Sequence, residues 1–104
     1  MFVAIYTFTI HPNKEAEFIE AWEALTKLIY EYENSLGSRL HRKSETEFIA
    51  YAQWPDKNTW KNSGDKLPVS ATQWRQQMRA SCSNIETQHE LEMLSDLIQQ
   101  QTHQ

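Results

Sequence analysis

The N-terminal segment, residues 2–10, carries apolar side chains on both faces of an alternating pattern. Tyr6 and Phe8 fall on one face, while Val3 and Ile5 fall on the other. The segment is rich in β-branched and aromatic residues, which favour extended backbone. A strand that is apolar on both faces needs cover on both sides, so the pattern predicts an interior strand of a sheet.

Residues 14–34 follow a different rhythm, with apolar positions recurring every three or four residues. Phe18, Trp22 and Leu25 begin this stripe, and the opposite side is mostly acidic and basic. The spacing predicts a long amphipathic helix lying on the sheet. Asn13 precedes the pattern and is the predicted N-cap.

Two further strands are predicted at residues 36–43 and 48–54, joined by a short polar turn. Such a link between two strand patterns is typical of a hairpin. The second strand is again apolar on both faces. Gly37 lies at the end of the preceding helix, where it can adopt a positive φ.

The second half of the chain predicts a short helix from its cap Asp56 to Asn62 and a longer helix that begins at Ser70 or Thr72 and ends at about Cys82. In the longer helix Ala71, Trp74 and Met78 are expected to face inward.

A fourth strand is predicted over residues 84–94, where apolar and acidic positions alternate. Strict alternation places His89 on the same inward face as Ile85 and Thr87.

The order strand, helix, hairpin, helix pair, strand predicts an α+β fold, the ferredoxin-like β-α-β-β-α-β sandwich. Helices then cover one face of the sheet only. The interior strands are apolar on the other face as well, so we expect a second copy of the chain to cover that face in a homodimer. The domain is expected to span residues 1–94, with a polar tail at 95–104.

The composition of the chain argues against several classes of binding partner. The formal net charge of −4 argues against nucleic acid or an anionic membrane as a partner, because either would require a basic surface. No apolar stretch is long enough to span a bilayer. Cys82 is the single cysteine, so no intrachain disulfide forms, which fits a cytoplasmic protein. The histidines are too scattered for a metal site.

The segment FIAYAQWPDKNTW, residues 48–60, resembles the antibiotic biosynthesis monooxygenase (ABM) family. Its apolar strand ends in Trp54, an acidic helix start follows, and Trp60 supplies the bulky residue one turn later. The first strand, the HPNKE sequence at residues 11–15 and the following helix are similar to the N-terminal half of that family. The resemblance covers about residues 2–94.

This resemblance implies a dimeric α/β barrel with a pocket in each protomer between the sheet and the helices. It also implies a cofactor-independent monooxygenase that oxidises a small aromatic phenol or quinol with molecular oxygen, with no cofactor. Such a site must bind a flat ring, stabilise its anion and exclude water. The predicted site residues are His89 and Trp60 as catalytic residues, and Tyr6, Tyr51, Trp54, Trp74, Arg75 and Met78 as substrate-binding residues.

Other readings stay open. Each aromatic residue could instead simply pack in the core. His89 could be a core histidine whose hydrogen bonds are satisfied within the protein, and Arg75 could form an ion pair with surface acidic residues. For the whole chain, the alternative is a non-catalytic dimeric domain of the same fold that binds a small molecule or acts in stress. A weaker third is haem binding or degradation. The haem-degrading branch of the family has an Asn on the first strand and a His after the third, where this chain has Ala4 and Tyr6 and no His between Pro55 and Cys82.

Overall fold

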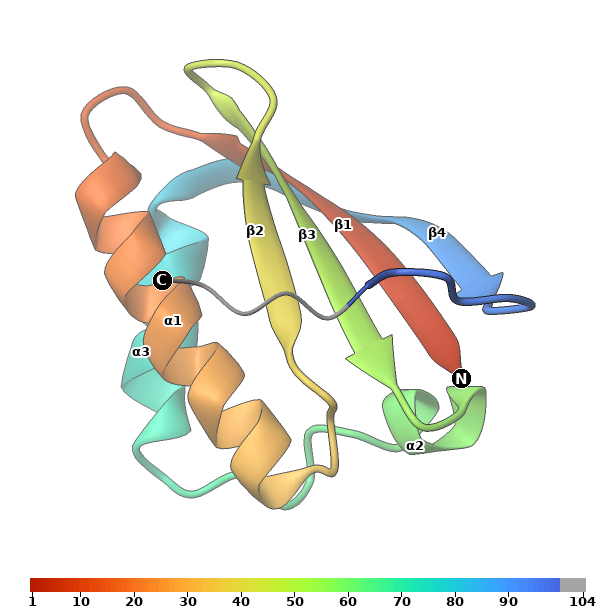
Figure 1. The fold of residues 1–104 in the computed structure, drawn as a ribbon. Coiled ribbons are helices and arrows are strands. Elements are labelled where there is room, and N and C mark those ends of the chain that lie inside the picture. The colour runs from red at the N-terminus through yellow and green to blue at the C-terminus, as the bar shows by residue number, and fades with distance from the viewer. Residues whose placement is uncertain (100–104) are drawn as a thin grey trace.

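The computed structural model describes residues 1–99 and has the predicted α+β ferredoxin-like architecture. Four strands and three helices follow the expected order along the chain (Figure 1). The elements are β1 (Phe2–Ile10), α1 (Glu15–Tyr32), β2 (Ser38–Arg42), β3 (Glu47–Trp54), α2 (Lys57–Lys61), α3 (Ala71–Ala80) and β4 (Cys82–Glu92).

The four strands form one antiparallel sheet in the order β2-β3-β1-β4. The two interior strands, β3 and β1, are those that the sequence predicted to be apolar on both faces. Both edge strands are more polar, and every residue of β4 after Cys82 is exposed. This distribution follows from the sheet order, because interior strands lose the most water on both sides.

One face of the sheet packs against α1 and α3, which lie side by side (Figure 1). Phe18 of α1 and Phe48 of β3 are the largest fully buried side chains, and their rings meet edge to face at 5.7 Å. Phe8 of β1 lies 4.9 Å from Phe18. Packed aromatic rings of this kind contribute about 0.5–1.5 kcal/mol per pair beyond their buried area.

The start of α1 differs from the prediction. Lys14, not Asn13, occupies the N-cap, and no side chain caps the helix there. Asn13 has a φ of 66°, a left-handed conformation that asparagine tolerates in turns. Beyond the C-terminal end of α1, Asn34 has a φ of 63°, and Gly37 has the positive φ that was predicted for it, 102°.

The opposite face of the sheet, here called the open face, is covered by no helix of the described residues. Strand register assigns it the following side chains: Val3, Ile5, Thr7, Thr9, Arg39, His41, Glu47, Ile49, Tyr51, Gln53, Asn84, Glu86, His89 and Leu91. Its centre is apolar, as the sequence predicted.

After Glu92 the described chain has no regular structure up to residue 99. Leu94, predicted as the end of the fourth strand, lies outside β4 and is exposed, and in the predicted polar tail Leu97 and Ile98 are exposed as well. Residues 100–104 of the tail lie outside the described part. Among the helices described, none is long and apolar enough to cross a membrane.

Candidate functional site

A cavity of about 180 Å³ lies between the sheet and the helices. Its walls come from α1, α3 and all four strands, together with the turn that follows α1. The lining is formed by Tyr6, Phe8, Trp22, Leu25, Thr26, Ile29, Ser35, Ser38, Ala50, Ala52, Trp54, Met78 and Ile85.

The cavity exists because β3 presents small side chains at its centre. Phe48, Ala50, Ala52 and Trp54 share the face toward the helices, and all four are buried. The two large rings fill the ends of this row, while the two alanines leave space in the middle. Trp22 of α1 lies across that space. The result is an apolar chamber of the kind that accommodates a flat hydrophobic ligand.

The hydroxyl of Tyr6 is the titratable group on the cavity wall. The indole Nε1 of Trp60 donates a hydrogen bond to it at 2.6 Å. Burial raises the pKa of Tyr6 above its ordinary value, the Trp60 hydrogen bond opposes that rise, and the charge of Glu90 adds to it. Tyr6 is therefore a neutral hydroxyl at neutral pH. Because Trp60 donates to its oxygen, its own proton is free to donate elsewhere.

The helix α2 holds Trp60 in this position. Asp56 caps α2, accepting from the backbone N–H of Thr59 at 2.7 Å as predicted. The Trp60 ring packs on Phe2 of β1 at 5.1 Å. An ion pair of 3.4 Å between Lys57 and Glu90 ties α2 to β4. Three separate contacts thus fix the indole against the Tyr6 hydroxyl.

Trp54 supplies the second polar group of the wall. Its side chain is 4% exposed, and its Nε1 has no hydrogen-bond partner in the described part of the chain. A buried donor without a partner costs about 1–3 kcal/mol of desolvation. The ring of Trp54 lines the cavity, while its Nε1 atom itself is covered by the surrounding protein.

Three predicted site residues line the cavity, namely Tyr6, Trp54 and Met78. Trp60 does not itself line the cavity among the described residues, but it contacts the lining residue Tyr6 through a hydrogen bond.

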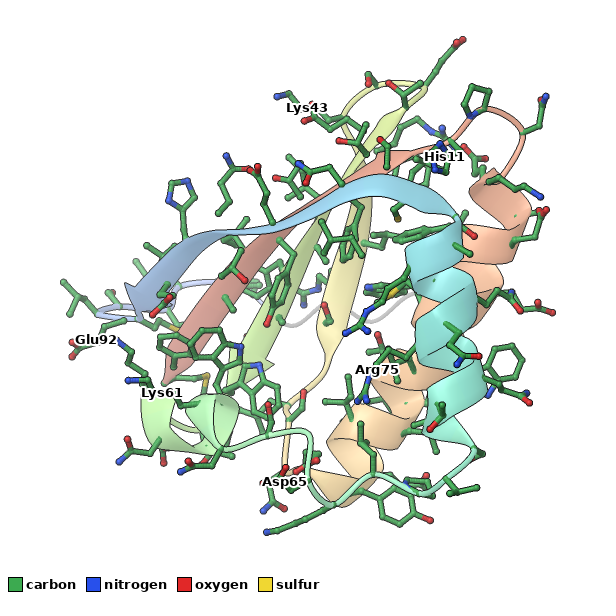
Figure 2. The ribbon with its side chains drawn as sticks, turned by 180° about the vertical axis from the view of Figure 1, so that it is seen from behind. His11, Lys43, Lys61, Asp65, Arg75 and Glu92 are labelled. Atoms are coloured by element: carbon green, nitrogen blue, oxygen red, sulfur yellow. The ribbon has the colours of Figure 1, made fainter. Side chains whose placement is uncertain are left out.

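Trp74 and Arg75 lie on α3, half-buried, and are not among the described residues that line the cavity. Arg75 is on the side of α3 that faces the sheet (Figure 2), four residues after Ala71 and three before Met78.

Tyr51 and His89 lie on the other side of the sheet. Tyr51 pairs with Ile5, and so does His89 from the opposite edge of β1. Ile5 points to the open face, so both side chains point there too. The prediction that Tyr51 lines the cavity is therefore wrong, because its side chain lies on the opposite face of the sheet.

The expected orientation of His89 is also wrong, and a β-bulge is the reason. Thr87 pairs with Tyr6, whereas His89 pairs with the adjacent Ile5, which leaves Gln88 as an extra residue in β4. An extra residue reverses the alternation of every side chain that follows it. Ile85 and Thr87 face the helices as predicted, while His89 is exposed on the open face.

Sequence reasoning placed the α1 stripe in the core and did not assign Trp22, Leu25 or Ile29 to the site. The signal was the pair of alanines between two aromatic rings on one face of β3, since small residues opposite a large helix stripe leave room. Ser35 and Ser38 at the end of the cavity carried no pattern of their own.

Within residues 1–99 no cluster of three or more His, Cys, Asp or Glu side chains could hold a metal ion. Ser38 donates to the backbone carbonyl of Tyr51 at 2.8 Å, and Ser35 accepts from the backbone N–H of Gly37 at 2.9 Å. Both serine oxygens thus take part in local backbone contacts. Besides the serines, the polar groups of the lining are the hydroxyls of Tyr6 and Thr26 and the indole N–H of Trp54.

The sequence model of a protein family described as Antibiotic biosynthesis monooxygenase matches residues 1–80 of the chain. No curated protein is similar enough in sequence to match.

Solved structures share the fold at low sequence identity. The cofactor-independent oxygenase SnoaB from Streptomyces nogalater is 14% identical, with a TM-score of 0.72 over 94% of this chain and 97% of that one. The protein PA3566 from Pseudomonas aeruginosa is 19% identical, with a TM-score of 0.69 over 90% and 94%. The protein Rv0793 from Mycobacterium tuberculosis is 10% identical, with a TM-score of 0.68 over 93% and 98%.

Proposed function

The chain belongs to the antibiotic biosynthesis monooxygenase family, and from that premise we propose that it oxidises a small phenol or quinol with molecular oxygen, without a cofactor. The observation that carries the proposal is an apolar cavity lined by Tyr6 and by Trp54, whose buried indole N–H has no partner among the described residues. A small rotation of the Trp54 ring would bring this N–H to a ring oxygen in the cavity, and the new hydrogen bond would offset the desolvation cost of the donor.

Two donors act on the same ligand in this proposal. The Tyr6 oxygen accepts a hydrogen bond from Trp60, so the Tyr6 hydroxyl can donate its own proton to the ligand. The indole N–H of Trp54 is the second donor to the ligand. Fixed donors in a site shielded from water stabilise an oxyanion more than water does. They therefore favour the phenolate, the electron-rich form that transfers an electron to oxygen.

The overall reaction balances without another reductant. A phenol with a free para position loses two hydrogens and gains one oxygen atom, giving a quinone. The second oxygen atom leaves as water with those two hydrogens. The substrate supplies all four electrons, so the protein needs to supply binding, orientation and exclusion of water.

The cavity size selects the substrate class. An apolar cavity of about 150 Å³ accommodates benzene, so the 180 Å³ here fits one aromatic ring with its substituents. We infer a single-ring substrate rather than a polycyclic one. The same limit disfavours haem, whose four linked pyrrole rings need far more space.

The homodimer is part of the proposal. The open face carries Ile5, Ile49 and Tyr51 at the centre of the sheet, and a monomer would leave them facing water. A second copy is the simplest cover for this face.

Oxygen uptake tests the function. We expect uptake with single-ring phenols and quinols, and little with two- and three-ring analogues. Tyr6→Phe and Tyr51→Phe form a matched pair, the same chemical change on opposite faces of the sheet. Tyr6→Phe should lower kcat/KM by about tenfold or more, while Tyr51→Phe should have little effect.

The alternative function is a non-catalytic binding domain. Binding of the single-ring ligands without any oxygen uptake above the uncatalysed rate would favour it. Equal loss from Tyr6→Phe and Tyr51→Phe would show that the cavity is not the site.

A further inference from the structure

A polar cleft of about 310 Å³ lies between α2, the loop that follows α2, and the turn after α1. It is separate from the apolar cavity, because the two share no lining residue. Every side chain that lines the cleft is polar or charged. Its volume is at the lower end of the range for ligand-binding clefts, about 300–1,000 Å³, so the cleft suits a small hydrophilic molecule.

The most buried side chain of the cleft is Glu33, which is 4% exposed. Its Oε2 accepts from the backbone N–H of Gly64 and of Lys66, whereas its Oε1 forms no hydrogen bond with a described residue. Within residues 1–99, the only fully covered side-chain nitrogen or oxygen without a partner is Nε1 of Trp54. Oε1 of Glu33 is therefore reachable, and it can accept from a ligand in the cleft.

Asp56 supplies the second carboxylate of the cleft, at the N-terminal end of α2. Its Oδ1 accepts from the backbone N–H of Thr59 at 2.7 Å and from the Thr59 hydroxyl at 2.8 Å. These hydrogen bonds lower the pKa of Asp56, so its carboxylate is charged at neutral pH. Since both bonds go to Oδ1, Oδ2 is left for a ligand.

Three amides and one ammonium group complete the lining. Asn58 and Asn62 are four residues apart, so their side chains lie on the same face of α2. Asn34 lines the cleft from the turn after α1, and Lys66 from the loop after α2. Each amide offers two donors and an acceptor. The cleft thus combines two negative groups, one positive group and neutral hydrogen-bonding groups.

This combination of charges selects the class of ligand. The two carboxylates favour an ammonium group, and Lys66 favours a carboxylate in the same molecule. A calcium ion prefers a shell of oxygen ligands, and the positive charge of Lys66 in the same cleft would repel it. An aromatic ligand would find no apolar side chain among the described lining residues.

We propose that this cleft binds a small α-amino acid with a hydrophilic side chain. The ammonium group of the ligand contacts Glu33 and Asp56, its carboxylate contacts Lys66, and its side chain forms hydrogen bonds with the asparagines. Hydrogen bonds between charged groups are stronger than neutral ones, which gives a small ligand enough affinity for a specific site. The proposal does not rest on the reaction in the cavity.

Three related ligands test which groups the cleft recognises. Serine carries both charges, ethanolamine is serine without the carboxylate, and glycerate has a hydroxyl in place of the ammonium group. In an NMR titration of the full chain, serine should shift the amide signals of Asn58, Asn62 and Gly64 to saturation. Ethanolamine should bind at least about fivefold more weakly than serine, and glycerate should not reach saturation.

Two matched pairs of variants locate the binding groups. Asparagine caps a helix about as well as aspartate, so Asp56→Asn should retain α2 and weaken serine binding by about fivefold or more. Asp65→Asn, in the exposed loop after α2 (Figure 2), is its control and should leave the affinity unchanged. Lys66→Gln should weaken serine but not ethanolamine, while Lys61→Gln on the exposed surface of α2 should change neither.

The same measurements can overturn the proposal. It fails if serine causes no saturable shifts around the cleft, or if serine and ethanolamine bind equally well. Equal effects of Asp56→Asn and Asp65→Asn would place any serine binding outside the cleft. Binding of Ca²⁺ but not of serine would make the cleft a cation site. Each of these results stands whether or not the chain consumes oxygen.

Discussion

The indole Nε1 of Trp60 donates a hydrogen bond to the hydroxyl of Tyr6 at 2.6 Å, and so joins α2 to the cavity wall. An indole N–H can only donate, so the bond settles which role the Tyr6 oxygen plays toward Trp60. The Tyr6 proton is then directed away from α2. The contact between Tyr6 and Trp60, which lie 54 positions apart in the sequence, thus determines that the Tyr6 hydroxyl acts as a donor toward the cavity.

Replacement of Trp60 by Phe tests this relationship. Trp60→Phe retains a ring against Phe2 but removes the donor to Tyr6. We expect the free energy of unfolding to fall by about 1 kcal/mol and the affinity for a phenolic ligand to fall about fivefold. The pKa of Tyr6 should rise further, because the hydrogen bond from Trp60 lowers it.

A double-mutant cycle with Tyr6→Phe supplies the control. In the Tyr6→Phe background, Trp60→Phe should have little additional effect on ligand affinity. Additive losses would mean that Trp60 acts on the ligand by another route.

Removal of the unpartnered indole N–H of Trp54 should affect ligand binding but not the stability of the free protein. Trp54→Phe keeps a buried ring and removes the unsatisfied N–H. We expect the unfolding free energy of the free protein to change by less than about 1 kcal/mol, while ligand affinity measured by calorimetry falls. Trp54→Ala should instead cost about 3–5 kcal/mol, as a large buried ring does. A large stability loss in Trp54→Phe would show that the N–H has a partner in the folded protein.

The position of His89 gives a negative prediction. His89 points to the open face, on the far side of the sheet from the cavity. His89→Ala should therefore leave kcat/KM for oxygen uptake within about twofold of the wild type, well short of the 10²–10⁴-fold that a general acid or base contributes. A loss of a hundredfold at an unchanged dimer constant would return His89 to the catalytic site.

The sequence predicted the fold because its signals were redundant. The period of the α1 stripe, the doubly apolar strands and the polar hairpin turn all indicated the same topology. The uncovered face was predictable for the same reason, since Ile5 and Ile49 alternate with residues that face the helices.

The site was predicted less well, for two physical reasons. Gln88 carries no mark of a bulge, and one extra residue turned His89 to the other face. The cavity is also a property of volumes summed over several elements, with Ala50 and Ala52 opposite Trp22. A periodic pattern shows which side chains share a face but not how much space remains between them.

The pH dependence of Cys82 follows from its burial. Burial raises the pKa of this thiol from 9.0 to about 11. The folded state therefore keeps the proton that the unfolded chain loses, so stability is intact below pH 9 and declines as the pH rises toward 11. Unfolding by urea between pH 8 and 11, compared with Cys82→Ala, isolates this contribution. Alkylation of Cys82 at neutral pH should be slow, because the thiolate is the reactive form.

The carboxylate of Glu33 holds the loop between α2 and α3 against the end of α1. It accepts from the backbone N–H of Gly64 at 2.6 Å and of Lys66 at 3.0 Å, and the residue is buried. Hydrogen bonds to an ionised carboxylate contribute more than neutral ones, about 1.5–3 kcal/mol each. Glu33→Gln keeps the shape but removes the charge, so we expect the free energy of unfolding to fall by about 1–3 kcal/mol.

Hydrogen exchange shows whether the loss is local. In Glu33→Gln the amides of Gly64 and Lys66 should exchange faster, while those of β1 should change only as much as global stability does. Glu31→Gln, an exposed position on the same helix, is the matched control and should change neither. Unchanged protection of Gly64 and Lys66 in Glu33→Gln would mean that the loop is held by its other contacts, such as the bond from the Ser63 hydroxyl to the carbonyl of Trp60 at 2.6 Å.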